Sequence, residues 1–296
     1  MESAPPPSAP GPPAVTPAGV RLPDFVIIGA AKAGTTTLYR WLGEQPEVFL
    51  ADPKEPVFFS REWHRGLGWY GELFRGARAD QRAGEASTAY TDPDHAEAAE
   101  RMAATVPDAR LVYSVRHPEE RLRSHHRDRR RRGVETKALL PAIAADPGRY
   151  LGRSKYFERL QPFLACFPRE QVLVVRFEDL VDPQGTAWAR VLDHLGLPPR
   201  PAPSTKANVT AESTAVSPLL VRMAQLRKDR QWRVPAFAKQ AVRRALSRDR
   251  PADRLLAESR APLPAEIVDP LWDDAARLAE FLGAGAPLWE RTPPDA

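Results

Sequence analysis

The chain has 296 residues, of which 43% are hydrophobic and 27% are charged, and its formal net charge is +5. This length allows one large domain or two small ones, and the hydrophobic share is enough for a substantial core. No apolar run reaches the roughly 20 residues that a bilayer-spanning helix needs. The single cysteine, Cys166, excludes an intrachain disulfide and a cysteine-rich zinc site, and the histidines show no metal-ligand spacing. We therefore expect no metal site and no transmembrane segment.

The first 22 residues are rich in proline and alanine and lack the basic and apolar segments of a secretory signal. This composition predicts a disordered tail at 1–22, with a proline-rich docking motif as the alternative. The rest, 23–296, is interpreted as one domain. The missing signal and the bias toward alanine, arginine and proline favour a cytoplasmic, bacterial protein.

The positive charge is concentrated in two segments. Arg121 to Arg132 carries seven arginines and one aspartate, and Arg222 to Arg250 carries ten lysines or arginines and two aspartates. Local basic patches indicate an anionic ligand at particular places. The second patch falls within 217–256, where apolar residues at helical spacing predict a basic helical insertion. This insertion is either a solvated helix packed on the core or a lid or surface that meets an anionic acceptor or a membrane. Residues 127–132 have the same two readings, a solvated helix face or attraction of an acidic acceptor.

Apolar runs and helical periodicity alternate along the chain. An aromatic loop is expected over 63–74. We predict strands at 25–28, 84–93 (a strand end running into a turn), 110–118 and 171–180. We predict helices at 35–42, 96–105, 119–132, 154–167 and 187–195, and a last helix within the segment 265–289 that ends before GAPLW. Strands separated by helices indicate an α/β fold, with a P-loop-like parallel sheet flanked by helices. Ligands of such folds bind at the carboxyl ends of the strands.

A glycine-bracketed loop follows the first predicted strand. Gly29 and Gly34 enclose Lys32, and Thr35 opens a helix. Glycines let the backbone approach an anion, and the first helical N–H groups point at it. A nucleoside triphosphatase loop has lysine directly after the second glycine, followed by a magnesium-binding serine or threonine. Here the lysine lies inside the loop, which predicts a nucleotide held without a magnesium-bound β,γ-phosphate.

Several motifs in this order resemble one known family. They are GAAKAGTTTLYRWL, KEPVFF, VYSVRHPEERLRS, RSKYFERLQPFLACFP and LVVRFEDLVDP, between Asp24 and Trp289. Together they are similar to sulfotransferases that use 3′-phosphoadenosine 5′-phosphosulfate (PAPS), in the branch of the heparan sulfate N- and O-sulfotransferases and their bacterial relatives. The resemblance implies PAPS as co-substrate, transfer of a sulfuryl group to a hydroxyl or amine, release of adenosine 3′,5′-bisphosphate, and no metal.

PAPS carries two separate anionic groups, so two sites are expected. The 5′-phosphate would meet the loop residues Lys32, Ala33, Gly34, Thr35, Thr36 and Thr37, through backbone N–H groups and hydroxyls. Lys32 would also neutralise charge on the bridging oxygen as the S–O bond breaks. The 3′-phosphate would meet Arg116 and Ser124, which match the family pattern Arg-x-Pro-x-x-Arg-x-x-Ser. In that pattern Arg121 is interpreted as a weaker candidate that pairs with an acid.

Glu55 is the candidate general base. An attacking hydroxyl or amine must lose a proton, and the resembling enzymes use a glutamate at this place in KEPxFF. The alternative is that Glu55 only pairs with Lys54 or Lys32. Phe58 and Phe59 are expected in the core.

The sequence also departs from the family. Val57 and Ser60 stand where some polysaccharide O-sulfotransferases of this branch have histidine and aspartate, which argues against a heparan-like acceptor. The loop that closes over the nucleotide corresponds to 204–213, from which Lys206 is carried over. Glu85 and Ser87 match a family segment that borders the acceptor cleft.

Two rival functions remain. A P-loop kinase or NTPase has an acidic candidate in Glu178 or Asp179 but lacks the Gly-Lys-Thr sequence. A nucleic-acid-binding protein would use Arg121 to Arg132, although no recognised nucleic-acid module is present. We therefore predict a PAPS-dependent sulfotransferase whose partner is a small-molecule or glycan acceptor and not a nucleic acid. Carbohydrates, glycolipids and natural products are all open as acceptors.

Overall fold

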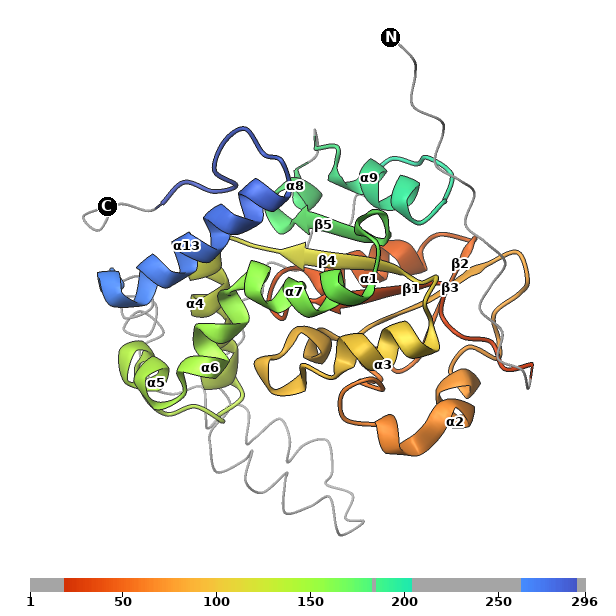
Figure 1. The fold of residues 1–296 in the computed structure, drawn as a ribbon, viewed down its shortest axis with the longest axis horizontal. Coiled ribbons are helices and arrows are strands. Elements are labelled where there is room, and N and C mark those ends of the chain that lie inside the picture. The colour runs from red at the N-terminus through yellow and green to blue at the C-terminus, as the bar shows by residue number, and fades with distance from the viewer. Residues whose placement is uncertain (1–18, 183–184, 204–261, 292–296) are drawn as a thin grey trace, which may run out of the picture. The chain divides into compact units, whose positions relative to one another are not determined.

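The computed structural model describes residues 19–182, 185–203 and 262–291 (Figure 1). The predicted insertion at 217–256 and most of the predicted tail lie outside these ranges. The chain divides into two compact units, Met1–His117 with Tyr156–Ala207 and Pro118–Lys155 with Asn208–Ala296.

A five-stranded parallel sheet forms the centre of the first unit (Figure 1). Its strand order is β2-β3-β1-β4-β5, and each neighbouring pair is parallel. The strands are β1 (Phe25–Gly29), β2 (Val48–Leu50), β3 (Arg82–Ala86), β4 (Arg110–Val115) and β5 (Val172–Arg176). The first strand lies between β3 and β4. The chain therefore forms β2 and β3 on one side of β1 and then β4 and β5 on the other. The carboxyl ends of the strands meet at one edge, which confirms the predicted α/β fold with a parallel sheet.

One face of this sheet is covered by α1 (Thr35–Gly43) and α9 (Ala187–His194). Phe25 and Ile27 of β1 belong to a buried cluster with Trp41 of α1 and Trp188 of α9. The two indole rings meet edge to face, with centroids 5.6 Å apart. Alternation along a strand turns successive side chains to opposite faces, so apolar residues on both faces of β1 predict a sheet covered on both sides.

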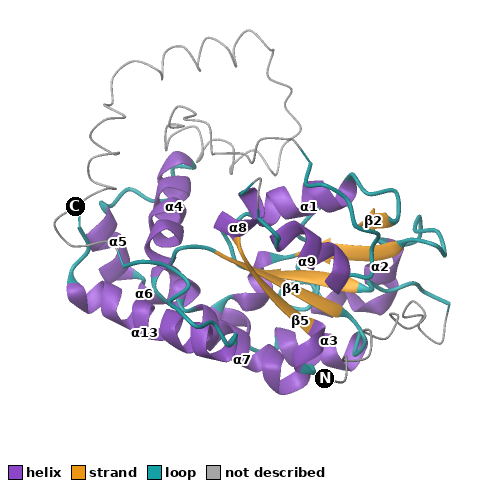
Figure 2. Cartoon of the chain, turned by 90° about the horizontal axis from the view of Figure 1, so that it is seen from above, coloured by secondary structure: helices purple, strands orange, loops and turns teal. Residues whose placement is uncertain are grey.

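The opposite face carries α3 (Ala98–Thr105) and α7 (Tyr156–Cys166), which contact each other (Figures 1 and 2). Tyr113 of β4 meets Tyr156 of α7 edge to face, with ring centroids 6.1 Å apart. Met102, Leu160 and Phe163 are buried beneath these helices. The helices predicted at 96–105, 154–167 and 187–195 are confirmed within a few residues at their ends.

Two local predictions in this unit are corrected, and one short strand is added. The aromatic stretch 63–74 is not only loop, because it contains a 3₁₀ turn at Trp63–Arg65 and α2 (Gly66–Glu72). The strand predicted at 171–180 ends at Arg176, and α8 (Phe177–Val181) follows, because Arg176 Nε donates to Asp179 Oδ2 at 2.8 Å and closes the turn. The edge strand β2 was not predicted, since three residues are too few to show an alternating pattern.

The second unit is helical in its described part. It contains α4 (Pro118–Arg131), α5 (Leu139–Ala145), α6 (Pro147–Tyr150) and α13 (Ala265–Phe281). Leu122 of α4 packs in a buried cluster with Ile143 of α5 and Leu271 of α13. The helix predicted at 119–132 is confirmed. The last helix ends before GAPLW, as predicted, and Gly283 adopts a left-handed φ of 65° just after it.

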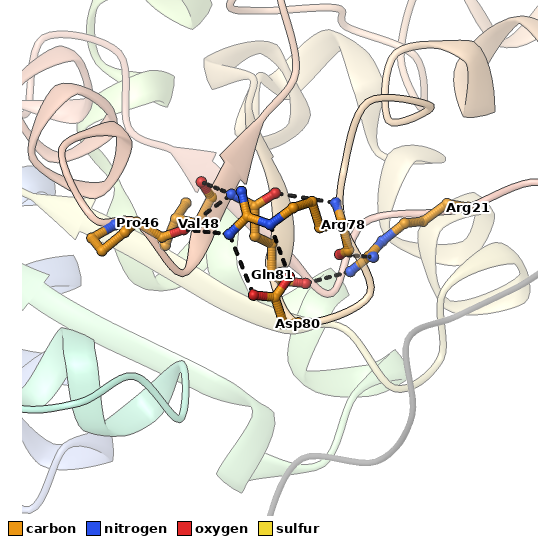
Figure 3. A network of polar contacts seen from close by, with 6 residues as sticks. All are labelled: Arg21, Pro46, Val48, Arg78, Asp80 and Gln81. Atoms are coloured by element: carbon orange, nitrogen blue, oxygen red, sulfur yellow. Dashed lines mark hydrogen bonds and ion pairs between the residues drawn. The ribbon is translucent and has the colours of Figure 1, made fainter.

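Arg21 ties the start of the described chain to the amino edge of the sheet (Figure 3). Its guanidinium donates to the carbonyl oxygens of Arg78 at 2.6 Å and Gln81 at 2.5 Å, and it pairs with Asp24 at 3.1 Å. Gln81 in turn donates to the carbonyl oxygen of Pro46 at 3.0 Å. This network fixes the end of the sheet opposite the loop 30–34 that follows β1, which is called the phosphate loop here after its predicted role.

Candidate active site

The loop after β1 is held against the neighbouring strand β4. The Ala30 N–H donates to the Ser114 carbonyl oxygen at 2.6 Å, and the Ser114 hydroxyl donates to the Ala33 carbonyl oxygen at 2.5 Å. Ser114 is fully buried. Between these anchors, Lys32 adopts a left-handed φ of 71°. That conformation costs a non-glycine residue free energy and is kept only where the surroundings impose it.

Gly34 ends the loop and begins α1 with a φ of 86°. A Cβ atom at this position would lie 2.1 Å from Cδ2 of Phe177. The glycine is therefore required both by its backbone conformation and by the close approach of the aromatic ring. Phe177 is the first residue of α8, so the ring connects the phosphate loop to the carboxyl end of β5.

No side chain caps the amino end of α1. Its first residues, Thr35 to Thr37, present backbone N–H groups at the carboxyl edge of the sheet, and the hydroxyl-bearing Thr36 is exposed. The first N–H groups of a helix have no partner within the helix, and the helix dipole favours negative charge there. The arrangement has the chemistry of an anion site.

Glu55 lies over the end of β3, at the same edge of the sheet as the loop after β1. Its backbone N–H donates to the Ala86 carbonyl oxygen at 3.0 Å, and its φ is 64°. The carboxylate pairs with Lys54 Nζ at 3.1 Å and accepts from the Thr88 hydroxyl at 3.4 Å, and its side chain is 40% exposed. The pairing with Lys54 is the alternative foreseen from the sequence, yet the exposed carboxylate still faces solvent at the carboxyl edge of the sheet.

Arg116 follows β4 at the same edge. Its backbone N–H donates to the Tyr156 hydroxyl at 3.4 Å, and its guanidinium carbon lies 5.5 Å from the centroid of the Phe177 ring. The same ring contacts Gly34, so Phe177 stands between the phosphate loop and Arg116. The next residue, His117, donates its N–H to Glu178 Oε1 at 2.9 Å, which fixes the loop against α8.

The structure leaves two other predicted binding residues untested, and it gives Arg121 a structural role. Ser124 lies on α4 in the second unit and is 8% exposed, so its convergence with Arg116 on one phosphate stays a prediction. Lys206 lies outside the described residues. Arg121 is fully buried and donates to the Ser154 hydroxyl and the Tyr150 carbonyl oxygen, each at 2.7 Å. These two hydrogen bonds connect parts of the second unit, and the sequence did not predict them.

The structure adds two residues that the sequence did not single out. Phe177 lies inside the strand predicted at 171–180. The acidic residues that follow it, Glu178 and Asp179, are typical of the first turn of a helix and could have indicated that the strand ends before it. Thr88 follows the GEAS segment and contacts the Glu55 carboxylate. Phe58 and Phe59 are fully buried, as expected, and Phe58 stacks on Tyr70 with ring centroids 4.2 Å apart.

Comparison with known proteins gives one matching family model. Residues 69–201 match the model of the Sulfotransferase family. This region of the chain is similar in sequence to sulfotransferases. The matched part includes β3, β4 and β5, and the phosphate loop precedes it.

Relatives and a solved structure agree with this similarity. The chain is 32% identical over 192 residues to mouse heparan sulfate glucosamine 3-O-sulfotransferase 3B1, and the match covers 60% of the chain and 47% of the relative. It is 34% identical over 204 residues to human heparan sulfate glucosamine 3-O-sulfotransferase 6, covering 64% of the chain and 57% of the relative. The chain thus spans about half the length of the curated relatives it matches.

The structure of a sulfotransferase from Alicyclobacillus acidocaldarius is similar over nearly its whole length. Its TM-score is 0.57 at 27% identity, and the match covers 79% of this chain and 99% of that one. The names of these relatives and of this solved structure all describe sulfotransferases.

None of the helices in the described ranges combines the length and apolarity needed to cross a membrane. No set of three or more histidine, cysteine, aspartate or glutamate side chains is grouped there to hold a metal ion.

Proposed function

We propose that this protein transfers a sulfuryl group from PAPS to a hydroxyl or amine of an acceptor. The observation that supports the proposal is that three groups lie at the carboxyl edge of one sheet. These are the phosphate loop with Lys32, the exposed Glu55 carboxylate, and Arg116 on the Phe177 ring. The match to the Sulfotransferase family model supports the same reaction.

The proposed reaction is an in-line displacement at sulfur. The acceptor oxygen or nitrogen attacks sulfur, and the bond between sulfur and the bridging oxygen of PAPS breaks. Glu55 takes the proton from the acceptor, and adenosine 3′,5′-bisphosphate leaves with the bridging oxygen. Lys32 neutralises the charge that develops on that oxygen, and the amino end of α1 holds the 5′-phosphate.

Arg116 binds the 3′-phosphate in this proposal, with Ser124 and Lys206 as further contributors from the sequence. A guanidinium suits a phosphate because its donors form charge-assisted hydrogen bonds with two oxygens. The stacking of Arg116 on Phe177 limits the side-chain freedom that binding would otherwise remove.

The acceptor is a small molecule or glycan in this proposal. Val57 and Ser60 supply no ionisable group at the positions where some heparan-directed enzymes carry histidine and aspartate, so we propose an acceptor that differs from heparan. The cytoplasmic location, the bacterial origin and a membrane contact through 217–256 stay predictions from the sequence.

Calorimetric titration tests the donor site first. Adenosine 3′,5′-bisphosphate is titrated beside ATP and AMP, without magnesium. We expect the bisphosphate to bind much more tightly than either, and Arg116→Ala to weaken that binding. A preference for magnesium-ATP would replace the proposal with a P-loop kinase or NTPase, and no nucleotide binding would remove it.

Turnover of PAPS with a panel of hydroxyl and amine acceptors tests the chemistry. Glu55→Gln is expected to lower kcat by a factor of ~10²–10⁴, because the amide cannot take the proton. Glu62→Gln is the matched control, since Glu62 lies in the same segment and pairs with Arg65 instead. Equal turnover of Glu55→Gln and Glu62→Gln would reject Glu55 as the base.

A further inference from the structure

Glu85 is a fully buried carboxyl group at the end of β3. Three hydroxyl groups donate to it. Those of Tyr70 and Tyr90 reach Oε1 at 3.0 and 2.5 Å, and that of Ser87 reaches Oε2 at 2.7 Å. A buried charge is tolerated only when hydrogen bonds satisfy it, and this set of donors satisfies both oxygens of a carboxylate.

Ser87 connects this carboxyl group to the segment that carries Glu55. Its hydroxyl oxygen accepts from the Val57 N–H at 3.0 Å. Because the hydroxyl hydrogen points at Glu85, an oxygen lone pair is left to face Val57. The acceptor role of Ser87 toward Val57 therefore depends on an acceptor at Glu85.

The Glu55 segment needs such support. Glu55 and Val57 both adopt left-handed backbone conformations, with φ of 64° and 49°, which are unfavourable for side chains of these types and for a β-branched residue in particular. Three contacts from the end of β3 hold them. Ala86 accepts from the Glu55 N–H, Ser87 accepts from the Val57 N–H, and Thr88 donates to the Glu55 carboxylate.

We propose that Glu85 is a positioning residue: as a carboxylate it orients the Ser87 hydroxyl, which through Val57 holds Glu55 in place for proton transfer. This inference rests on the proposed function, in which Glu55 takes the proton of the acceptor. Glu85 itself touches no reacting atom in this account.

The pKa of Glu85 lies in the pH range in which many enzymes work. Burial is the main cause that raises its pKa, to about 7, and the negative charge of Glu55 raises it further. The three hydrogen bonds from hydroxyl groups act in the opposite direction and lower it. Other titratable groups bear on the same cluster, namely Tyr39 of α1, Tyr70 of α2 and Tyr90 of the following 3₁₀ turn. Burial and the charge of Glu85 raise the pKa of all three phenols, so they stay neutral, and Glu85 is the member of the cluster that titrates near neutral pH.

Two variants separate this proposal from a merely structural role. In Glu85→Gln, the oxygen facing the two tyrosines is kept, and the atom facing Ser87 becomes an NH₂ donor that competes with Val57. In Ser87→Ala, the link to Val57 is removed directly. The control is Asp24→Asn, because Asp24 accepts from the Ala83 N–H at 2.7 Å at the opposite end of the same strand.

Amide hydrogen exchange at pH 8 and steady-state kinetics provide the readouts. We expect exchange of the Val57 N–H to be at least tenfold faster in Glu85→Gln and Ser87→Ala, and unchanged in Asp24→Asn. We expect kcat to fall about tenfold or more in both variants, with KM for PAPS unchanged, since misplacing a reacting group costs up to ~10²-fold. The loss of kcat on lowering the pH through about 7 is expected to disappear in Glu85→Gln.

The two losses are also expected not to add. Because both residues act through one connection, the double variant should have the kcat of Ser87→Ala alone. Unchanged Val57 exchange in both variants, or additive losses of kcat, would overturn the proposal. If the unmodified protein binds no bisphosphate and transfers no sulfuryl group, the proposed function fails, while Val57 exchange still decides whether Glu85 positions the loop.

Discussion

The position of Lys32 is set by the backbone conformation of its loop. The bonds from Ser114 to both ends of the loop leave it in a left-handed conformation at the carboxyl edge of the sheet, beside the uncapped start of α1. The sequence predicted the loop and the role of its lysine from the glycine spacing. It could not predict that Ser114, 81 residues from Ala33, holds the loop in shape.

Removing the Lys32 ammonium should slow the chemical step. We expect Lys32→Ala to lower kcat by a factor of ~10²–10³, because charge on the leaving oxygen is no longer neutralised. Binding of adenosine 3′,5′-bisphosphate should change much less. Lys137→Ala, at an exposed position in the second unit, is the control. Single-turnover measurement with PAPS checks the result, and near-normal turnover would reject the mechanism.

Glu85 should make the stability of the protein depend on pH. Its pKa in the folded protein is about 7, above the usual 4.5, so between these values the folded state holds a proton that the unfolded chain has released. Stability therefore falls as the pH rises through this window, by on the order of 3 kcal/mol from this group.

Urea denaturation at pH 5 and pH 8 measures this dependence. Glu85→Gln cannot ionise and is expected to flatten the difference between the two pH values, whereas Asp24→Asn should leave it in place. An unchanged pH dependence in Glu85→Gln would show that the Glu85 carboxyl group does not titrate in this window.

At the scale of elements, α8 connects the two halves of the candidate donor site. Its first residue, Phe177, contacts Gly34 at the start of α1 and lies under the Arg116 guanidinium. The sequence predicted a strand through this point because the apolar run of β5 continues into Phe177. The structure ends the strand at Arg176, where the side chain pairs with Asp179.

Gly34→Ala is expected to destabilise the protein and weaken bisphosphate binding. The left-handed φ of 86° and the approach of Phe177 to 2.1 Å both oppose a Cβ atom. Together they should cost roughly 1–3 kcal/mol of unfolding free energy. Phe177→Ala should recover part of this loss in the double variant, because it removes the steric clash but not the backbone strain.

Urea denaturation of the two single variants and the double variant measures the coupling between these positions. Residues in contact typically couple by ~0.5–3 kcal/mol. Strictly additive losses would mean that Phe177 does not restrict Gly34 in solution.

At the scale of the whole molecule, a bound donor product should stabilise the fold. A ligand at a hundred times its Kd that binds only the folded state adds about 2.7 kcal/mol. We expect adenosine 3′,5′-bisphosphate to raise the Tm accordingly, and magnesium-ATP to raise it less. Thermal denaturation with each nucleotide checks this expectation.

Arg116→Ala should reduce that stabilisation. Loss of hydrogen bonds from a charged group costs ~1.5–3 kcal/mol, which corresponds to roughly 10- to 150-fold weaker binding. Arg110→Ala is the matched control, since Arg110 begins the same strand at its opposite end. Equal shifts of Tm in the two variants would place the 3′-phosphate away from Arg116.

The sequence by itself determined the local features of this protein. Apolar runs marked β1, β4 and β5, helical spacing marked α1, α3, α4, α7, α9 and α13, and the loop with Lys32 marked an anion site. These features depend on residues close together in the chain, and their order carried the resemblance to sulfotransferases.

Only the tertiary structure decided which distant residues meet. Phe177 contacts Gly34, Ser114 holds Ala33, and Ser87 accepts from Val57, across separations of 30 to more than 100 residues. Such contacts follow from strand order and from the packing of side chains on the sheet, which leave no periodic signal in the sequence. The raised pKa of Glu85 likewise arises from burial among side chains of three separate elements, so no local pattern could have predicted it.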